Sequence, residues 1–183
     1  MGRLVPKKGY AYLVEAARIL KDRGVPFEVR VIGGGPDHDA LSSRMASLDV
    51  ADRVKLEGSM PQEKLLPILR GADGFVLPCV LAKDGDQDGI PVSLMEAMAY
   101  EIPCVSTSIS GIPELIESGK EGLLVPEKDA AALADAIEKL AGDPELRAWL
   151  GSAGRRKVEQ SFTLEGLARE LDRLYRESIG ARA

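Results

Sequence analysis

The chain has 183 residues, of which 45% are hydrophobic, and its mean hydropathy is close to zero at −0.06. This length supports one sizeable hydrophobic core and is short for two domains. A formal charge of −5 and a pI near 5.1 exclude a general nucleic-acid or membrane-surface binder, because either would need a concentrated basic face.

The two cysteines and the first ten residues bear on the compartment. Cys79 and Cys104 lie inside apolar runs, which indicates small buried side chains in a reducing compartment rather than a disulfide framework. The opening MGRLVPKKGY lacks the apolar segment of a signal peptide, and no stretch approaches the roughly 20 apolar residues of a membrane span. We therefore expect a cytoplasmic protein.

Apolar runs typical of buried strands alternate with segments of helical spacing over the first two thirds of the chain. This alternation predicts an α/β fold, a Rossmann-like doubly wound parallel sheet with helices on both faces. The predicted strands are 27–32, 54–56, 75–80, 103–106 and 122–125. The predicted helices are 9–23, one capped by Asp37 or Asp39 that runs through Leu48, 63–70, 92–98 and 112–118.

From Asp129 onward the pattern is helical only. Leucine-rich segments predict three or four helices, separated near Gly142, Gly151 and Phe162. We therefore expect a single domain, 1–183, with an α/β core at 1–128 and a helical tail at 129–183.

The chain begins unusually for a doubly wound domain. Only Met1–Leu4 stand before the loop at Val5–Lys8, where a full first strand is expected. The first strand of such sheets is central, so a truncated one leaves a seam in the core. We infer that the chain is the back part of a longer protein.

The stretch from Lys83 to Ala99 carries the clearest chemistry. An acidic, glycine-containing loop leads directly into a helix, and free amides at a helix start attract anions. Asp88 lies in the loop, and Glu96 lies near the middle of an otherwise apolar helix, where a carboxylate is unfavourable unless it is paired or faces a cleft. Both are candidate ligand-binding residues.

The same loop resembles the start of a calcium site without completing it. Counting from Asp84, the twelfth position is Met95, whereas a calcium loop needs a carboxylate there, and Glu96 comes one residue too late. We expect no metal. For Asp84 and Asp86, a charged, solvent-exposed loop without function is an equal alternative.

Glycines and basic residues gather at the same predicted sheet edge. Gly33, Gly34 and Gly35 do not form the G-x-G-x-x-G fingerprint, which disfavours a nicotinamide cofactor, but they let backbone approach a ligand; simple turn formation explains them nearly as well. The basic residues Arg3, Lys7 and Lys8 could complete a diphosphate cradle. The lone His38 is expected at the surface, and neither Ser93 nor Ser161 has the context of a catalytic nucleophile.

Several motifs in order carry a family resemblance over essentially the whole chain. They are Gly2-Arg3-Leu4 with Lys8-Gly9, Val31–Pro36, Val54–Gly58, Asp88–Pro91 through Glu96–Ala99, Gly111–Glu114 and Gly122–Pro126. In this combination the chain resembles the C-terminal, donor-binding half of a retaining family 4 glycosyltransferase of the two-domain GT-B fold. The family's first spaced acid is usually Glu, and Asp88 shortens its reach by one methylene.

The resemblance implies a role for each charged candidate. Glu96 would hold the ribose hydroxyls of a nucleotide-sugar, and Asp88 would bind hydroxyls of the transferred hexose. Arg3 and Lys8 would neutralise the diphosphate and the charge that grows on it during transfer, a task that can replace a bound metal. Arg3, Lys8 and Asp88 are therefore the catalytic candidates.

The remaining implied positions bind the donor, a UDP-sugar or GDP-sugar, without a metal or other cofactor. The amides of Val92 and Ser93 would assist at the phosphate, since Pro91 has no N–H. The base pocket and the adjoining loop would be formed by Gly33, Gly34, Gly35, Ser59, Met60, Gly89 and Ile90.

The resemblance implies a transferase of hexosyl groups in glycan or polysaccharide assembly that retains the anomeric configuration. Its N-terminal acceptor domain would be absent here, so the fragment alone would be inactive or weakly active. The resemblance also admits peripheral membrane association of the full-length enzyme, and the Asp84–Gly89 insertion is similar to enzymes of exopolysaccharide synthesis. One alternative is a free-standing, non-catalytic nucleotide-sugar-binding module, and another, disfavoured, is a nucleotide-sugar epimerase.

Overall fold

The computed structural model describes residues 1–180; Ala181–Ala183, the end of the predicted helical tail, lie outside the described residues. The strands are β1 (Val29–Ile32), β2 (Val54–Gly58), β3 (Phe75–Leu77), β4 (Cys104–Thr107) and β5 (Gly122–Val125). A short 3-10 helix, η1 (Pro6–Lys8), precedes the helices α1 (Tyr10–Asp22), α2 (His38–Ser47), α3 (Gln62–Arg70), α4 (Val92–Ala99), α5 (Ile112–Leu115), α6 (Ala130–Gly142), α7 (Pro144–Ser161) and α8 (Leu164–Gly180).

The strands form two parallel sheets rather than one. β1 pairs with β2, and β3, β4 and β5 pair in that order, with Phe75 opposite Cys104 and Cys104 opposite Gly122. No strand joins β1 to β3 among the described residues. The seam expected from the short first strand is therefore present between these two edges.

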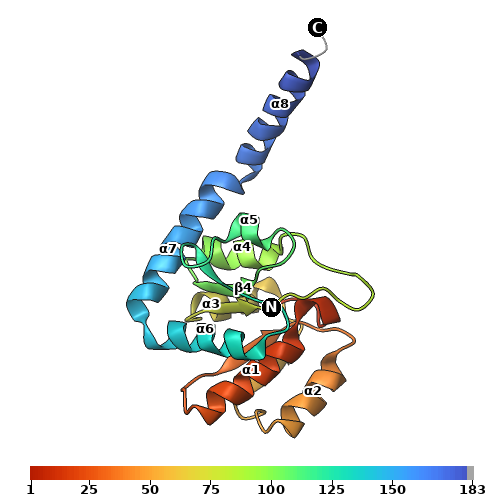
Figure 1. Ribbon diagram of the computed structural model, residues 1–183, viewed down its shortest axis with the longest axis vertical. Helices are drawn as coiled ribbons and strands as arrows, with labels where there is room; N and C mark the ends of the chain where they lie inside the picture. Colours follow the sequence, from red (N-terminus) through yellow and green to blue (C-terminus); the bar gives the residue numbers. More distant parts are fainter. Residues whose placement is uncertain (181–183) are drawn as a thin grey trace.

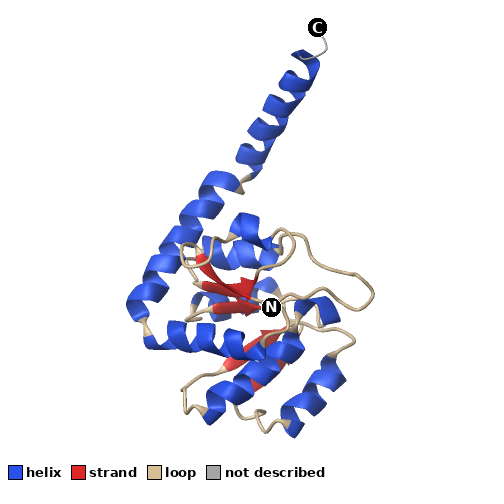
Figure 2. Ribbon diagram, viewed as in Figure 1, coloured by secondary structure: helices blue, strands red, loops and turns tan. Residues whose placement is uncertain are grey.

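Helices cover both faces of the three-stranded sheet (Figure 1, Figure 2). α4 and α5 lie on one side, and α6 lies on the other beside α1. β4 is the central strand, and all four of its residues are buried, as expected for a strand covered on both faces. The predicted α/β class, parallel pairing and two-sided helical cover are confirmed.

The predicted strand 75–80 is too long by three residues. The structure ends β3 at Leu77 because the next peptide groups leave the backbone ladder with β4. The Val80 N–H donates to the Lys7 carbonyl at 2.9 Å, and the Thr107 hydroxyl donates to the Cys79 carbonyl at 2.5 Å. The Val80 bond takes the chain towards η1, and the Cys79 carbonyl accepts from a side chain of β4 in place of a ladder N–H. Both cysteines are free and buried, as predicted.

Other predicted bounds need correction, among them the strand 54–56, which runs to Gly58, and the strand 103–106, which is Cys104–Thr107. The helix expected over 112–118 ends at Leu115 because Ile116 is extended, with φ −125° and ψ 115°. The strand expected from Phe27 begins at Val29. Gly151 does not separate helices: it lies inside α7, where a Cβ would come within 2.0 Å of the Glu101 carbonyl oxygen, so only glycine fits this close approach.

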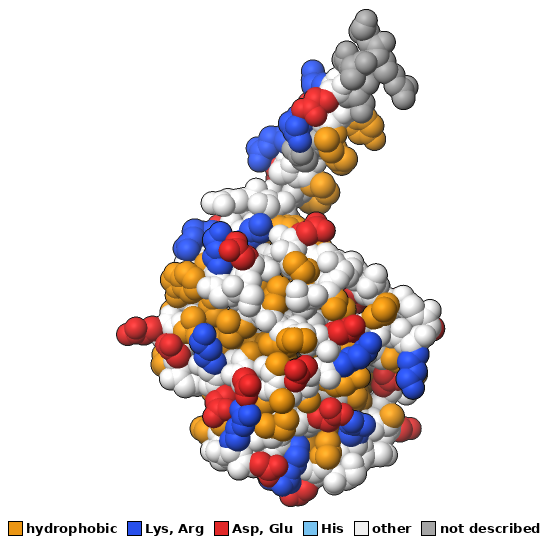
Figure 3. Space-filling model, in the orientation of Figure 1, with side chains coloured by type: hydrophobic (Ala, Val, Ile, Leu, Met, Phe, Trp, Pro, Cys, Tyr) orange, Lys and Arg blue, Asp and Glu red, His pale blue; other side chains and the backbone are white. Residues whose placement is uncertain are grey.

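The helical tail divides into a packed part and a projecting part. Leu133 and Leu140 of α6 are buried, and α7 packs against α4. α8 extends away from the body, and hydrophobic side chains line one of its edges (Figure 3). No helix within residues 1–180 is long and apolar enough to cross a membrane. The division at residue 128 stays a prediction.

Candidate functional site

A hollow of about 610 Å³ lies where the chain start meets the loop before α4. We call it the polar hollow. It brings together eight of the predicted site residues, from the chain start, the acidic loop and α4. Its lining comprises Met1, Gly2, Arg3, Lys8, Leu65, Asp88, Gly89, Ile90, Pro91, Val92, Ser93 and Glu96.

Backbone pairing positions Arg3 at this hollow. The Gly2 N–H donates to the Ile32 carbonyl at 2.9 Å, and the Leu4 N–H donates to the Gly34 carbonyl at 2.9 Å. The chain start therefore continues beside the carboxyl end of β1 in the manner of a parallel ladder. Arg3, between the two bonded residues, is exposed and makes no side-chain hydrogen bond or ion pair within the described part of the chain.

A turn at Gly9 presents Lys8 to the hollow. Gly9 has φ +68°, and a Cβ there would lie 1.8 Å from the Pro78 carbonyl oxygen, so both its conformation and its packing require glycine. The Lys8 side chain is largely buried, and its Nζ lies 2.9 Å from Asp88 Oδ2. The predicted phosphate-binding cation and the predicted sugar-binding acid are thus paired with each other.

The acidic loop is held against η1 by its second aspartate. Lys7 Nζ lies 3.0 Å from Asp86 Oδ1 and 3.6 Å from Asp88 Oδ1. The Asp86 N–H in turn donates to Asp84 Oδ1 at 3.1 Å, which makes a local turn. Asp84 and Asp86 therefore have structural partners, and Lys7 serves the loop rather than the lining of the hollow.

The first turn of α4 faces the hollow with free backbone donors. Pro91 is the N-cap residue of α4, with φ −65° and ψ 122°. It stands one position before Val92, the first residue of the helix. The amides of Val92 and Ser93 belong to the first turn, which lacks intrahelical acceptors, and both residues line the hollow. This end of α4 carries the partial positive charge of the helix dipole, which favours an anion.

Glu96 lies one turn after Val92 on the same face of α4. Its side chain is exposed and makes no hydrogen bond or ion pair with another side chain within the described residues, and its charge partly offsets the burial that lowers the pKa of the Met1 amino group. Glu96 follows Val92 by four positions, which is about one helical turn. Its carboxylate therefore borders the same hollow as the amides of the first turn. A free carboxylate and a free guanidinium, that of Arg3, thus adjoin one anion site.

Burial changes the titration of three groups beside the hollow. Burial and the nearby Lys8 charge lower the pKa of the Met1 amino group to about 6. Burial and Asp88 raise the pKa of the Cys79 thiol to about 12, and its Sγ donates to Asp88 Oδ2 at 3.6 Å. Burial also raises the pKa of the Tyr10 hydroxyl, which has no hydrogen-bond partner within the described residues.

The residues predicted for the base pocket lie beside the chain start and not in the lining of the polar hollow. A Cβ on Gly34 would lie 3.0 Å from Ser59 Oγ, so these two are neighbours. A Cβ on Gly33 would come within 1.9 Å of the Gly2 carbonyl oxygen. The glycine run therefore makes room for the chain start, and its contact with a base, like that of Met60, stays a prediction.

Some participants were not predicted from the sequence. Met1 and Leu65 line the hollow, and Cys79 contacts Asp88. Leu65 is an ordinary apolar position of α3, and Cys79 follows a strand, so neither stands out as a site residue. The single exposed histidine, His38, pairs with Asp39 at 3.0 Å, as a surface residue would.

Curated glycosyltransferases are similar to this chain in sequence. The chain is 45% identical over 171 residues to the amylovoran biosynthesis glycosyltransferase AmsK of Erwinia amylovora, covering 93% of this chain and 42% of the relative. It is 34% identical over 156 residues to a GDP-mannose-dependent alpha-(1-6)-phosphatidylinositol monomannoside mannosyltransferase of Mycolicibacterium smegmatis, covering 85% and 41%. The chain therefore spans less than half the length of these relatives.

A solved structure shares the fold. Anabaena Alr3699/HepE, in complex with UDP, matches with a TM-score of 0.82 and 21% identity, over 97% of this chain and 47% of that one. The model of the family described as glycosyl transferases group 1 matches residues 1–157. Together with the fold, this match shows that the chain belongs to the glycosyl transferases group 1 family.

Proposed function

We propose that the polar hollow binds the donor of a glycosyl transfer, a sugar attached to UDP or GDP. The observation that carries this proposal is the convergence of two cations, a helix N-terminus and two carboxylates on one hollow of about 610 Å³. A diphosphate needs positive charge and amide donors, and a sugar or ribose needs carboxylate acceptors. Two similar proteins support a nucleotide-sugar donor. AmsK is described as a glycosyltransferase of amylovoran biosynthesis, and the structure of HepE, which has the same fold, contains UDP.

The cations and the helix amides bind the phosphates of the donor. Arg3 and Lys8 neutralise the diphosphate, and the amides of Val92 and Ser93 donate to it from the start of α4. The same groups stabilise the negative charge that grows on the leaving diphosphate as the glycosidic bond breaks. No metal is assigned to this step, and nucleotide affinity is expected to persist in excess chelator.

The two carboxylates accept hydrogen bonds from the hydroxyls of the ribose and the hexose. Glu96, which is free, accepts hydrogen bonds from the ribose. Asp88 accepts them from the hexose, and for this it exchanges its contact with Lys8, now 2.9 Å long, for the donor. Ser59, Met60 and the glycines 33–35 are assigned to the base, and Gly89 and Ile90 shape the loop above the phosphates.

In the whole enzyme we assign retention of the anomeric configuration, with the acceptor bound by a further, N-terminal domain. The enzyme would serve polysaccharide assembly in the cytoplasm, with peripheral membrane association where the acceptor requires it. The 183-residue chain alone would bind donor without transferring its sugar. Turnover of a nucleotide-sugar by this chain would contradict that assignment, and a stereochemical analysis of the product would test retention.

Calorimetry with two neighbouring variants tests the donor assignment. Glu96→Gln should weaken UDP or GDP and the matching nucleotide-sugar alike, by about tenfold or more, because a charge-assisted hydrogen bond is lost. Asp88→Asn should weaken the sugar conjugate, which loses a hydroxyl acceptor, and should leave free nucleoside diphosphate bound as tightly or more tightly, because Lys8 is released from its 2.9 Å pairing with Asp88.

Asp84→Asn provides the matched control, since Asp84 is an acid of the same loop whose side chain, within the described residues, accepts from the Asp86 N–H alone. Its affinities should equal those of the unmodified chain. Unchanged nucleotide affinity in Glu96→Gln would refute the ribose role, and equal losses of both ligands in Asp88→Asn would refute the hexose role. A thermal-shift panel of UDP-sugars and GDP-sugars would identify the donor.

A further inference from the structure

Three side chains contact the Asp88 carboxylate. Its Oδ2 lies 2.9 Å from Lys8 Nζ and accepts from Cys79 Sγ at 3.6 Å. Its Oδ1 lies 3.6 Å from Lys7 Nζ. Of these three partners, Lys8 alone belongs to the lining of the polar hollow. Lys7 and Cys79 therefore contact the acid from outside the space that a donor would occupy.

Donor binding, as proposed above, removes the nearest of these partners. Lys8 leaves Asp88 for the diphosphate, and the acid turns to the hydroxyls of the hexose. The Asp88 side chain is only 17% exposed, so its charge would lose its closest cation in a largely buried place and stand near a negatively charged diphosphate. A second cation that stays behind when Lys8 moves would hold this carboxylate.

The Cys79 thiol cannot supply that charge. Burial and the Asp88 carboxylate raise the pKa of Cys79 to about 12, so it stays a neutral thiol and a weak donor. Lys7 differs, because its hydrogen bond to Asp86 raises the pKa of its ammonium group and keeps it charged. Among the described residues, Lys7 and Lys8 are the cations within 4.0 Å of Asp88.

Lys7 is anchored by contacts that do not involve Asp88. It lies in η1, and its carbonyl accepts from the Val80 N–H at 2.9 Å, which ties its backbone to the segment after β3. Its Nζ donates to Asp86 Oδ1 at 3.0 Å. Lys8 has no second ion pair within residues 1–180. Lys8 is therefore free to exchange Asp88 for another anion, whereas Lys7 stays in place.

We propose that Lys7 is a positioning residue of the donor site, which holds the Asp88 carboxylate when Lys8 moves from that acid to the diphosphate. This inference rests on the proposed function. Lys7 touches no part of the donor and acts through Asp88, so it contributes to recognition of the transferred sugar. The nucleoside diphosphate is bound without it.

A double-mutant cycle tests this role. Lys7→Met removes the ammonium group and keeps a side chain of similar length, and it is measured alone and combined with Asp88→Asn. Calorimetry measures UDP, GDP, UDP-glucose and GDP-mannose. The cycle is evaluated for the conjugate that the unmodified chain binds with the higher affinity.

Lys7→Met should weaken that conjugate by about tenfold and the matching free nucleoside diphosphate by less than about threefold. In the presence of Asp88→Asn, the same substitution should weaken the conjugate by less than about threefold, because the carboxylate charge through which Lys7 acts is gone. Lys7→Arg, which keeps a cation, should keep the affinity for the conjugate within about threefold of the unmodified chain.

Lys21→Met is the matched control. The side chains of Lys21 and Lys7 are equally exposed, at 24% and 25%, and Lys21 also pairs with two acids, Asp49 at 3.2 Å and Asp52 at 2.8 Å. It lies in the last turn of α1, at the opposite end from η1 (Figure 1). Its substitution should leave all four affinities unchanged.

Equal losses of the conjugate with and without Asp88→Asn would overturn the inference, because Lys7 would then act through the loop and not through Asp88. Unchanged affinity for the conjugate in Lys7→Met would overturn it as well. Failure of the proposed function shows in other proteins of the set. If the unmodified chain binds none of the four ligands, or Asp88→Asn alone spares the conjugate, the donor or hexose assignment falls and this inference falls with it.

Discussion

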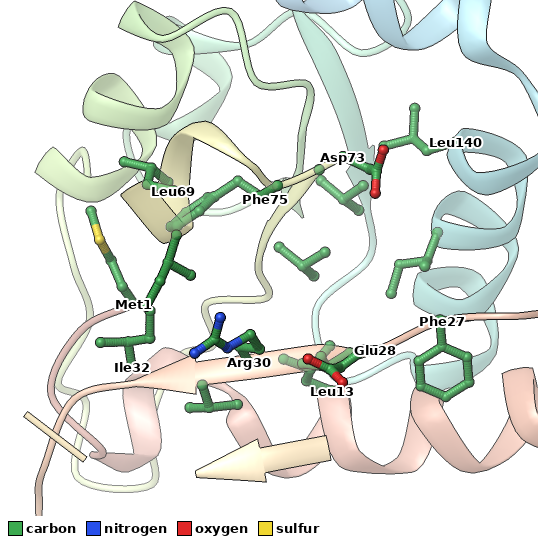
Figure 4. Close-up of a pocket in the computed structure, with 18 of the residues that line it drawn as sticks. Met1, Leu13, Phe27, Glu28, Arg30, Ile32, Leu69, Asp73, Phe75 and Leu140 are labelled. Carbon is green, nitrogen blue, oxygen red and sulfur yellow. The ribbon is translucent and has the colours of Figure 1, made fainter. Parts of the chain in front are cut away.

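The polar hollow meets a second cavity at Met1. This second cavity, the seam cavity, lies between β1 and β3 (Figure 4), and the two have similar volumes, about 610 and 590 Å³, but differently composed walls. Charged side chains and helix amides border the first. Strand edges and mainly apolar side chains enclose the second, with Glu28, Arg30, Asp73 and Arg147 among its lining. The first therefore suits a small charged ligand that is recognised by side chains. The second is bordered by strand edges that do not pair with each other, and the segment Met1–Lys8 connects the two spaces.

The largest effect is expected from a substitution at Gly33, which packs against the chain start beside both spaces. Gly33 has φ +142°, and a Cβ there would lie 1.9 Å from the Gly2 carbonyl oxygen. Gly33→Ala should lower the free energy of unfolding by about 3 kcal/mol or more, because backbone strain and overpacking add. Urea denaturation measures this loss.

Gly24→Ala is the matched control for that variant. Gly24 also has positive φ, +71°, but its Cβ would meet nothing within 4 Å. It should lower the free energy of unfolding by only about 1 kcal/mol, the strain of the left-handed conformation. Equal losses in the two variants would mean that the contact between Gly33 and the chain start has no energetic role.

The second effect is a pH dependence of the Met1 amino group, since Met1 lines both spaces. The pKa of the Met1 amino group is about 6 in the fold and near 8 in the unfolded chain, so between these values the unfolded state holds more protons. The free energy of unfolding should therefore rise with pH from 6 to 8, by about 2 kcal/mol, and the contribution should be flat above 8.

N-terminal acetylation separates this effect from other titrations. In protein whose Met1 is verified by mass spectrometry, the acetylated chain should lack the rise that the free amino group produces. A rise of the same size in acetylated protein would assign the pH dependence to other groups.

The smallest expected effect is a loss of nucleotide affinity at the polar hollow. Lys8→Met should weaken UDP or GDP binding by about tenfold, because a phosphate loses a charge-assisted donor. Lys7→Met should change the affinity by less than about threefold, because Asp86 holds that amine at 3.0 Å on the loop side. Calorimetry at two salt concentrations measures both, and similar losses in both variants would show general electrostatic attraction instead.

Local patterns in the sequence predict much of this molecule. Alternating apolar runs predicted the parallel strands, and the short segment before Val5 predicted the seam between β1 and β3. The loop before α4 and the carboxylate of Glu96 were recognisable because polar residues interrupt an apolar helix. These features depend on neighbours in sequence, so composition and spacing are enough to find them.

Features that depend on distant contacts could not be predicted in this way. Gly151 looks like a helix break, but it lies within α7 because the Glu101 carbonyl approaches it. The strand after Phe75 stops early because Val80 donates to Lys7, 73 residues before it in the chain. The pairing of Lys8 with Asp88 likewise joins segments that only the fold brings together.

Amide hydrogen exchange of the unmodified chain, with and without saturating UDP or GDP, tests the central claim most directly, because it reports on both spaces at once. Nucleotide should slow exchange at Val92 and Ser93, whose amides lie at the polar hollow, and should leave Arg30 and Val76 at the seam cavity unchanged. Protection at Arg30 and Val76 without protection at Val92 and Ser93 would contradict the assignment of the polar hollow as the donor site.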